Sequence, residues 1–494
     1  MQQLSATGRL LMLELDSLSL SFIQQHVGQL PTFGRLLDAG APVQTGTTAD
    51  IASASVWPTF ASGNLPGGHG RYFPFQWHPG KMRFCRDYAP DWRGALDYEP
   101  FWYELARRGV DSMVLDAVQS SPNPNPPCLE INDWSAQSSG HAVASDPQLL
   151  AELQRRFGRR PIGMEITVAK SRGLAQSLQR RAIVSLQRKA DAIIWLGQQR
   201  PWRFYLASIQ DAHRAGHNLW PVEGEFASDA PPDALLNVYR ALDERLGRIL
   251  QAFDDGATCI ILFTLNGMGP NRAQSHFVAQ ILHRLNRLYL TGACERAISD
   301  RRPGLMAQLR DRLPAGAQYA ANRLLGERVQ DWVVNRELTG GLDWAVTPSF
   351  AVASGGEGLI RLNISGRERE GMLGPDHSAI ARYVEWLRER LMTIRVTASG
   401  EPLIEEFILV HERYPGPRSA LLPDIALKWA PASPATEICS DDIGTIRNRL
   451  TTGRGGNHTG ESFALLSGSS DSRAQGGGLR HITDYRTLAT QLLT

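Results

Sequence analysis

The chain begins its fold with the apolar run Leu10-Leu-Met-Leu-Glu-Leu15, and Asp16 follows this run directly. A short apolar run of this kind fits a buried strand. Further strand-like runs lie at 112–115, 204–209, 258–264, 359–362, 407–410 and 425–429. They alternate with helix-like periodic segments at 30–37, 99–108, 147–157, 176–196, 233–253 and 378–392. This alternation predicts an α/β fold with a mostly parallel central sheet flanked by helices.

The length of 494 residues exceeds that of one ordinary domain. We expect a core formed by residues 8–275 and 345–470. Loops within about 74–141 are rich in Pro, Gly, Asn and aromatic residues and predict a lid. Residues 276–344, which are Arg-rich and lack strand signals over most of their length, predict a helical insertion. Residues 471–494 form a C-terminal tail, polar and Gly-rich at its start.

Composition limits the classes of function. The net charge of +2 argues against a strong electrostatic footprint for nucleic acid or anionic lipid. The five cysteines are widely spaced and form no CxxC pair, so we expect neither a disulfide framework nor a thiolate zinc site. No segment is long and apolar enough to cross a bilayer, so we expect a cytoplasmic protein that does not bind membranes. The sequence does not indicate an oligomeric state.

Two further polar clusters carry side chains that can bind a metal, as Asp16 can. Asp211-Ala-His213-Arg-Ala-Gly-His217 follows the run 204–209, and His458 lies in the Gly-rich stretch 451–460. Ligands bind beyond the carboxyl ends of the strands in open α/β sheets, so these clusters are expected to converge. In a helix, His213 and His217 share one face and can bind one metal. For Asp16, a helix N-cap is the alternative interpretation.

Three further segments have both a chemical and a structural interpretation. The hydroxyl-rich stretch Thr45–Ser62 leads into a predicted helix, where a hydroxyl either caps the helix or takes part in phosphoryl transfer. The Gly-rich stretch 264–269 is either a site of close backbone approach or an ordinary turn between a strand and a helix. Arg361 and Arg367 either clamp an anionic substrate or form salt bridges.

Together these segments resemble the alkaline phosphatase superfamily, and within it the type I phosphodiesterase/nucleotide pyrophosphatase group and its predicted phosphohydrolase relatives. The resemblance runs from Leu10 to Ser467, with about 280–345 outside it. Its motifs are the strand ending at Asp16, Leu30-Pro-Thr-Phe-Gly-Arg-Leu-Leu-Asp-Ala-Gly40, Trp57-Pro-Thr-Phe-Ala-Ser-Gly63 with Pro66 and His69-Gly70, Arg361-Leu-Asn363 with Gly366-Arg367-Glu368, and His458.

The resemblance implies an alkaline phosphatase-like sheet and a pair of divalent metals, usually zinc, beside a nucleophilic Ser or Thr. Counting back from the Trp57–Gly63 motif places the family nucleophile at Ser53, with Ser55 as the second choice. The better-preserved metal site would use His217 and His458, with His213 or Asp211 as the third ligand. Alignment on the residues before Trp220 puts His213 where relatives usually have Asp.

The other metal site departs from the family pattern. Relatives have a Ser-Asp-His-Gly-Met-like turn that supplies two ligands, and this chain has Leu265 and Asn266 there. Leu cannot bind a metal, and Asn offers only a neutral carbonyl oxygen. That site would keep Asp16, Ser53 and Asn266. We therefore expect one divalent metal, which the family resemblance indicates is zinc, with a second metal as the alternative.

The leading hypothesis is a metal-dependent phosphoester hydrolase or phosphoryl-type transferase that acts on a small anionic phosphoester, either a diester or a monoester. Ser53 would be the nucleophile, and Arg361 or Arg367 would bind the substrate. Two alternatives stay open. One is a one-metal group-transfer enzyme of a specialised biosynthetic pathway. The other is a catalytically inactive superfamily member that acts as a binding protein.

Overall fold

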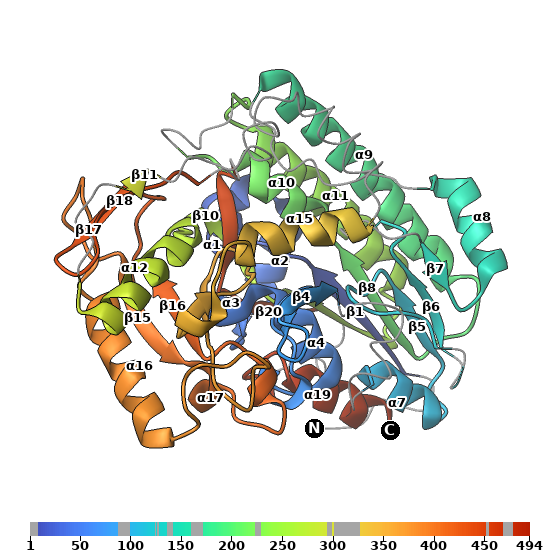
Figure 1. Ribbon diagram of the computed structural model, residues 1–494. Coiled ribbons are helices and arrows are strands. Elements are labelled where there is room, and N and C mark those ends of the chain that lie inside the picture. The colour runs from blue at the N-terminus through green and yellow to red at the C-terminus, as the bar shows by residue number, and fades with distance from the viewer. Residues whose placement is uncertain are drawn as a thin grey trace.

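The computed structural model describes residues 8–86, 99–123, 125, 128–135, 142–159, 171–222, 229–293, 299–300, 327–450, 454–467 and 478–494. Figure 1 shows the chain as two neighbouring sheet regions, with the larger sheet and its helices on the right and the smaller sheets on the left. Parts of the predicted lid (87–98, 136–141), insertion (294–298, 301–326) and tail (471–477) lie outside the described residues.

The larger sheet has eight strands in the order β2-β20-β9-β1-β8-β5-β6-β7. Its four central pairings, β9-β1, β1-β8, β8-β5 and β5-β6, are parallel, and the pairings at its two edges are antiparallel. The strands are β1 (Arg9–Leu15), β2 (Val43–Gln44), β5 (Ser112–Leu115), β6 (Leu129–Asn132), β7 (Val143–Ala144), β8 (Phe204–Ile209), β9 (Thr258–Phe263) and β20 (Phe463–Ser467).

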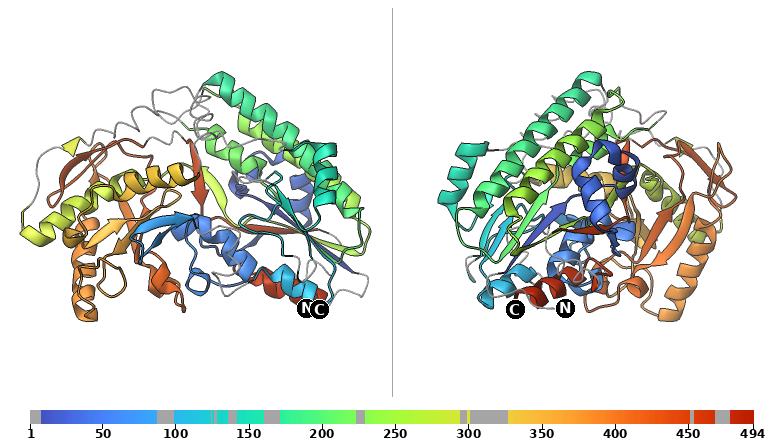
Figure 2. Two further views of the ribbon diagram at one scale, coloured as in Figure 1. Left: turned by 45° about the vertical axis from the view of Figure 1, so that its right-hand side comes forward. Right: turned by 180° about the vertical axis from the view of Figure 1, so that it is seen from behind.

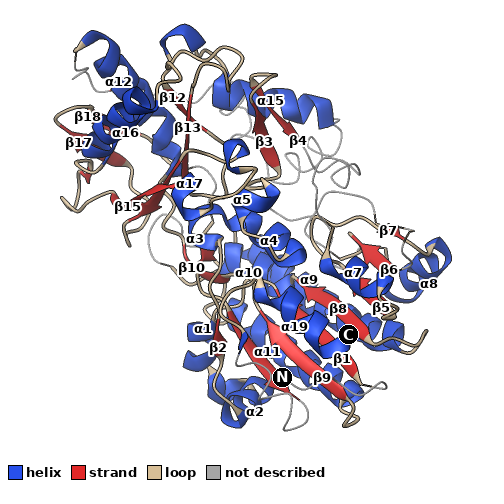
Figure 3. Ribbon diagram, turned by 90° about the horizontal axis from the view of Figure 1, so that it is seen from below, coloured by secondary structure: helices blue, strands red, loops and turns tan. Residues whose placement is uncertain are grey.

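Strand β1 is mostly apolar because both faces of the sheet are covered, and its Glu14 is buried with a hydrogen bond from Ser208. Leu11, Leu13 and Leu15 point into one core, while Leu10 and Met12 point into the other. The first core is closed by α1 (Leu20–Gln25), α2 (Pro31–Ala39), α8 (Pro147–Phe157), α9 (Arg172–Gly197), α10 (Asp211–Leu219) and α11 (Ala234–Phe253). The second core is closed by α4 (Val56–Ser62), α7 (Phe101–Arg107) and α19 (Asp484–Leu493). Figure 3 shows helices on both sides of the strands.

The smaller region contains two four-stranded sheets, in the orders β12-β13-β16-β15 and β11-β18-β17-β14. The first has β12 (Ser349–Ala351), β13 (Gly358–Leu362), β15 (Ile404–Leu409) and β16 (Ile425–Trp429). The second has β11 (Ser299–Asp300), β14 (Arg395–Val396), β17 (Glu437–Ser440) and β18 (Gly444–Arg447). Helices α12 (Val278–Thr291) and α16 (His377–Leu391) pack into the apolar core shared by these sheets.

Two ribbons and several short helices connect the regions. The ribbons are β3 (Phe75–His78) with β4 (Arg83–Arg86), and β10 (Gly267–Pro270) with β19 (Gly456–Thr459). The remaining helices described in detail are α3 (Ala49–Ala52), α5 (Pro66–His69), α15 (Glu327–Thr339) and α17 (Val410–Arg413). In the left view of Figure 2, the β10-β19 ribbon stands between the larger sheet and the smaller sheets.

The predicted α/β class with a mostly parallel central sheet is confirmed. Within the predicted lid range, β5 and β6 belong to the larger sheet. Within the predicted insertion, α12 contributes buried residues to the smaller region, and within the predicted tail α19 contributes buried residues to the second core. None of the helices among the described residues is long and apolar enough to cross a membrane.

Candidate active site

The site lies at the carboxyl edge of the larger sheet. Asp16 follows β1, helix α10 follows β8, and the turn with Leu265 and Asn266 follows β9. The β10-β19 ribbon then brings His458 to the same edge, because Met268 of β10 pairs with His458 of β19. Parallel neighbours end at one edge, so these segments, which are far apart in the sequence, meet there.

Three histidines form the centre of the site. The ring centroids of His213, His217 and His458 lie 4.7, 4.8 and 4.9 Å apart. One ligand nitrogen from each ring lies within 4.8 Å of the other two. Among the described residues, this is the one group of three or more His, Cys, Asp or Glu side chains that converges in this way.

Each of the two helical histidines is oriented by an acceptor on its outer nitrogen. His213 Nδ1 lies 2.7 Å from Asp16 Oδ2, and His217 Nδ1 lies 3.0 Å from the carbonyl oxygen of Gly456. A carbonyl can only accept a hydrogen bond, and so can an ionised carboxylate, so both Nδ1 atoms donate. Both Nε2 atoms then carry lone pairs, and they face each other at 2.9 Å.

Burial lowers the pKa of two of the three histidines. The pKa of His217 is well below its usual value because the ring is buried and lies near Arg454 and His213. Burial and the two neighbouring imidazoles likewise lower the pKa of His458. Burial alone would raise the pKa of Asp16, but the adjacent His213 and a hydrogen bond from Ser17 hold it below its usual value. Neutral imidazoles beside an ionised carboxylate are the protonation states that bind a divalent metal.

The residues fit a single divalent cation of the zinc type. Three imidazole nitrogens and an open position are typical of catalytic zinc, and a carboxylate or backbone carbonyl commonly orients such ligands. Facing lone pairs at 2.9 Å repel each other unless a proton or a cation lies with them. Asp211 is not part of this group: it begins α10, is buried, and lies in a charge cluster with Arg214, Lys189 and Asp116.

The donor set for a second metal does not fit. Asp16 has one oxygen on His213 and the other on the hydroxyl of Ser17, 2.8 Å away. The Asn266 amide lies 2.6 Å from His458 Nδ1 and 3.3 Å from Ser17 Oγ. Leu265 is fully buried in the second core. One shared carboxylate and one amide are a poor site for a second divalent ion.

The structure distinguishes the two candidate serines. Ser55 is fully buried, and its hydroxyl donates to the carbonyl oxygen of Ala52 at 2.7 Å and lies 2.7 Å from Thr48 Oγ1. Ser53 has no hydrogen bond from its hydroxyl within the described part of the chain, and its N–H donates to Glu357 Oε1 at 2.7 Å. The free hydroxyl favours Ser53 over Ser55 as the nucleophile.

Ser53 and the strand that carries His458 both border the loop 354–357. A Cβ atom added at Gly355 would lie 2.7 Å from Ser53 Oγ, and one added at Gly356 would lie 2.6 Å from Asn457 Nδ2. Asn457 precedes His458 and accepts its N–H at 3.0 Å. The hairpin tip 354–357 therefore bridges the serine and the strand that carries His458.

The two predicted substrate arginines are engaged elsewhere. Arg361 is buried and donates to Glu368 Oε1 and to the carbonyl oxygens of Leu422 and Ala420. Arg367 donates to Glu368, to the carbonyl oxygen of Leu362 and to both carboxylate oxygens of Asp424. These contacts support the salt-bridge interpretation of both residues, in the interior of the smaller region rather than at a substrate.

Sequence reasoning missed three residues that contact the histidines, Asp16 or Ser53. Arg454 NH1 lies 3.5 Å from His217 Nε2, and Ser17 Oγ lies 2.8 Å from Asp16 and 3.3 Å from His458. Glu357 holds the Ser53 N–H. Arg454 shares the Gly-rich stretch of His458 and Ser17 follows Asp16, so adjacency was a usable signal for both. Glu357 had no local signal.

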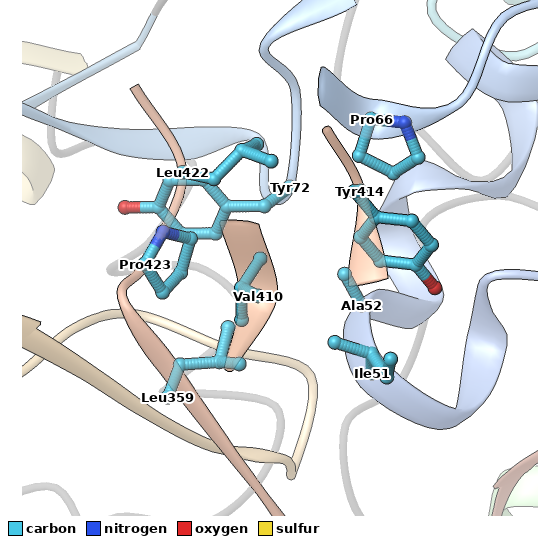
Figure 4. Close-up of a pocket in the computed structure, with 9 residues that line it drawn as sticks. All are labelled: Ile51, Ala52, Pro66, Tyr72, Leu359, Val410, Tyr414, Leu422 and Pro423. Atoms are coloured by element: carbon cyan, nitrogen blue, oxygen red, sulfur yellow. The ribbon is translucent and has the colours of Figure 1, made fainter. Parts of the chain in front are cut away.

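An apolar cavity borders the segment just before Ser53 (Figure 4). Ile51 and Ala52 line one side of it, with Tyr414 between Ala52 and Pro66, and Tyr72 and Leu422 lie opposite. The lining offers no charged group, so this cavity does not suit a phosphoryl group.

The edge of the larger sheet thus gathers three histidines and an orienting carboxylate, a set of side chains typical of metal-dependent enzymes. Comparison with known families then makes the assignment specific. A sequence profile of the type I phosphodiesterase/nucleotide pyrophosphatase family matches residues 10–338, so the chain belongs to that family. The predicted family and the prediction of an enzyme of the phosphoester hydrolase kind are thereby confirmed. No curated protein matches the chain.

Solved structures with a similar course of the chain include the phosphonoacetate hydrolase of Sinorhizobium meliloti 1021 in complex with phosphonoformate. It is 13% identical, with a TM-score of 0.48 over 99% of this chain and 96% of that one. An inactive variant of murine ectonucleotide pyrophosphatase/phosphodiesterase 5 with AMP is 12% identical, with a TM-score of 0.47 over 98% and 95%. The alkaline phosphatase PafA is also 12% identical, with a TM-score of 0.47 over 98% and 96%.

Proposed function

We propose that the protein is a metal-dependent phosphoester hydrolase or phosphoryl-type transferase that uses one divalent cation, zinc by donor chemistry, and Ser53 as its nucleophile. The observation that carries the proposal is the pair of lone-pair-bearing Nε2 atoms of His213 and His217, 2.9 Å apart, with His458 beside them. A divalent cation bound there supplies a Lewis acid for a phosphoryl oxygen and lowers the pKa of a bound hydroxyl.

The protein's own residues divide the remaining work. Asp16 and the Gly456 carbonyl hold the two imidazoles in the metal-binding tautomer. Arg454, adjacent to His217, offers a positive charge to a phosphoryl oxygen. Ser53 Oγ forms a bond to phosphorus and gives up its proton, while the bond from phosphorus to the leaving oxygen breaks and that oxygen takes up a proton to leave as the alcohol. Water or an acceptor alcohol then takes the phosphoryl group from Ser53.

The residues at the place of a second metal site favour a single cation. Leu265 and Asn266 leave Asp16 as its one carboxylate, and Asp16 is already bonded to His213. With one cation, the free Ser53 hydroxyl lacks a metal of its own to lower its pKa. This favours activated phosphoesters and group transfer over demanding substrates such as alkyl monoesters.

Metal content and turnover test the proposal together. We expect about one zinc per chain in protein purified without chelator, measured by plasma mass spectrometry, and hydrolysis of bis(4-nitrophenyl) phosphate. His217→Ala should lose both, whereas Ser53→Ala should keep the metal and lose turnover about 100-fold or more. The matched controls are the exposed His283→Ala and the buried Ser55→Ala.

The outcomes separate the alternatives. About two metals per chain would contradict the one-cation form. Absence of metal together with absence of turnover would support the inactive binding protein. Unchanged turnover in Ser53→Ala would remove that residue from its proposed role.

A further inference from the structure

The connection between β12 and β13 places a carboxylate against the proposed nucleophile. Glu357 Oε1 accepts the N–H of Ser53 at 2.7 Å. A Cβ atom at Gly355 would lie 2.7 Å from Ser53 Oγ and 3.3 Å from Glu357 Oε2. The serine hydroxyl and the glutamate carboxylate therefore border the same glycine.

Several contacts hold this loop in place. The Ser354 hydroxyl donates to the Glu357 carbonyl oxygen at 2.7 Å and accepts the Gly356 N–H at 3.3 Å. The Trp429 indole donates to the Gly356 carbonyl oxygen at 2.8 Å. A side chain at Gly356 would collide with Asn457 Nδ2. The loop is thus fixed on both sides, and the carboxylate is built into the site by the fold.

The Glu357 carboxylate accepts the Ser53 N–H, a hydrogen-bond donor that an incoming phosphoryl oxygen would otherwise use. The amide N–H of the nucleophile's own residue lies next to its Oγ, where charge develops during attack. Instead, that N–H is satisfied by an anion of the protein itself. A substrate must either share the space with this charge or compete with it.

The charges near the site add to this effect. Two carboxylate side chains, Asp16 and Glu357, and one guanidinium, Arg454, lie around the site, and burial lowers the pKa of His217 and His458. One divalent cation in place of two removes two positive charges from the site. Each negative charge on the phosphoryl group is then balanced by fewer cations and repelled by Glu357 at short range.

We propose that Glu357 limits the negative charge that the site accepts, so that it takes a phosphoryl group with one negative charge and rejects a dianionic monoester. Glu357 is a specificity-determining residue in this proposal, which rests on the proposed function of Ser53 and the histidine cluster. Removal of its charge should admit dianions without loss of the fold.

The experiment compares zinc-loaded wild type with Glu357→Gln and Glu357→Ala. Gln keeps an oxygen that accepts the Ser53 N–H but removes the charge, and Ala removes both. Hydrolysis of 4-nitrophenyl phosphate and bis(4-nitrophenyl) phosphate is measured at about pH 8, above the second phosphate pKa of roughly 6. Binding of inorganic phosphate and dimethyl phosphate is measured by calorimetry. The control is Glu385→Gln, an exposed carboxylate on α16.

In both variants, we expect the ratio of kcat/KM for the monoester to kcat/KM for the diester to rise about tenfold or more. We expect the affinity for inorganic phosphate to rise by a similar factor relative to the affinity for dimethyl phosphate. Unchanged ratios in correctly folded variants would overturn the proposal while the proposed function stands. Loss of turnover of both esters by more than about 100-fold would also overturn it and assign proton transfer to Glu357. If wild type hydrolyses neither ester, the proposed function fails, and the binding ratio still decides the role of Glu357.

Discussion

At the scale of single residues, the site depends on which atom of each imidazole is turned inward. Asp16 and the Gly456 carbonyl both accept from Nδ1, so Nε2 of His213 and His217 faces the centre. Asp16 thereby acts on the cation through His213 rather than as a free ligand of a second ion. The family resemblance had instead assigned Asp16 to the second metal site.

Asp16→Ala tests that role. Loss of the acceptor on His213 Nδ1 should weaken zinc binding about 10- to 100-fold, because orienting partners of metal ligands typically contribute that much. Affinity is measured by competition with a chromophoric chelator, and the control is the exposed Asp38→Ala on α2. If instead one of two bound metals disappears and the affinity of the other is unchanged, Asp16 is a direct ligand of a second metal.

At the scale of elements, the histidine cluster depends on the close approach of strand β19 and helix α10. A Cβ atom at Gly456 would lie 2.3 Å from the carbonyl oxygen of Gly216, and one at Gly216 would lie 2.8 Å from Met268 Cγ. The first contact is with backbone, which cannot move aside locally. Glycine is thus required at 456 by space, so that His458 of β19 can meet His217 of α10.

Gly456→Ala should therefore push β19 away from α10. We expect a loss of about 1–3 kcal/mol in the free energy of unfolding, as for other overpacked sites, together with weaker metal binding. Thermal or urea unfolding and zinc titration measure the two effects. Gly374→Ala is the matched control, because a Cβ atom there meets nothing within 4 Å. Equal behaviour of the two variants would contradict this packing argument.

Asp146 caps the N-terminus of helix α8, and the stability that this cap contributes depends on pH. The Asp146 side chain accepts the N–H groups of Gln148 and Leu149, and these bonds together with Arg200 hold the pKa of Asp146 below its usual value. A lowered pKa in the folded state adds stability above the unfolded pKa of about 3.9. That contribution is lost as pH falls through the folded pKa.

Asp146→Ala should accordingly cost about 1 kcal/mol near pH 7, the usual contribution of an N-cap, while Asp146→Asn should cost less because Asn still caps. The difference between wild type and the Ala variant should shrink in acid, below about pH 4. Urea unfolding at several pH values measures it. A constant difference across this range would show that the charge of Asp146 contributes nothing.

At the scale of the whole molecule, the site lies where the larger sheet meets the smaller region. The histidines and Asp16 come from the larger sheet and the β10-β19 ribbon, while Glu357 comes from the hairpin of β12 and β13 (Figure 1). Helix α19, at the end of the chain, closes the second core with Tyr485, Leu488 and Leu492. Both regions must fold for Ser53 to meet Glu357.

Removal of metal should destabilise this assembly as a whole. A ligand present at about 1,000 times its Kd stabilises the native state by about 4 kcal/mol. Treatment with a chelator should therefore lower the Tm by several degrees, and zinc should restore it. His217→Ala should show neither change. A Tm that is equal with and without chelator in wild type would contradict a bound metal in the purified protein.

Local pattern alone determined much of the architecture. The predicted strands 112–115, 204–209 and 425–429 coincide with β5, β8 and β16, and the helix 147–157 coincides with α8. Apolar runs and helical periodicity are read over a few neighbouring residues, so no distant contact was needed. The same pattern placed Asp16, His213 and His217 beyond strand ends, and the order of motifs along the chain identified the family.

The choice among candidate residues was decided by tertiary structure. A helix turns about 100° per residue, so Asp211 lies about 200° around α10 from His213 while His217 lies within about 40° of it. Only His213 and His217 can then face His458, which arrives from a distant strand. The engagement of Arg361 and Arg367, and the approach of Glu357 to Ser53 across 304 positions, depend on contacts that no local spacing encodes.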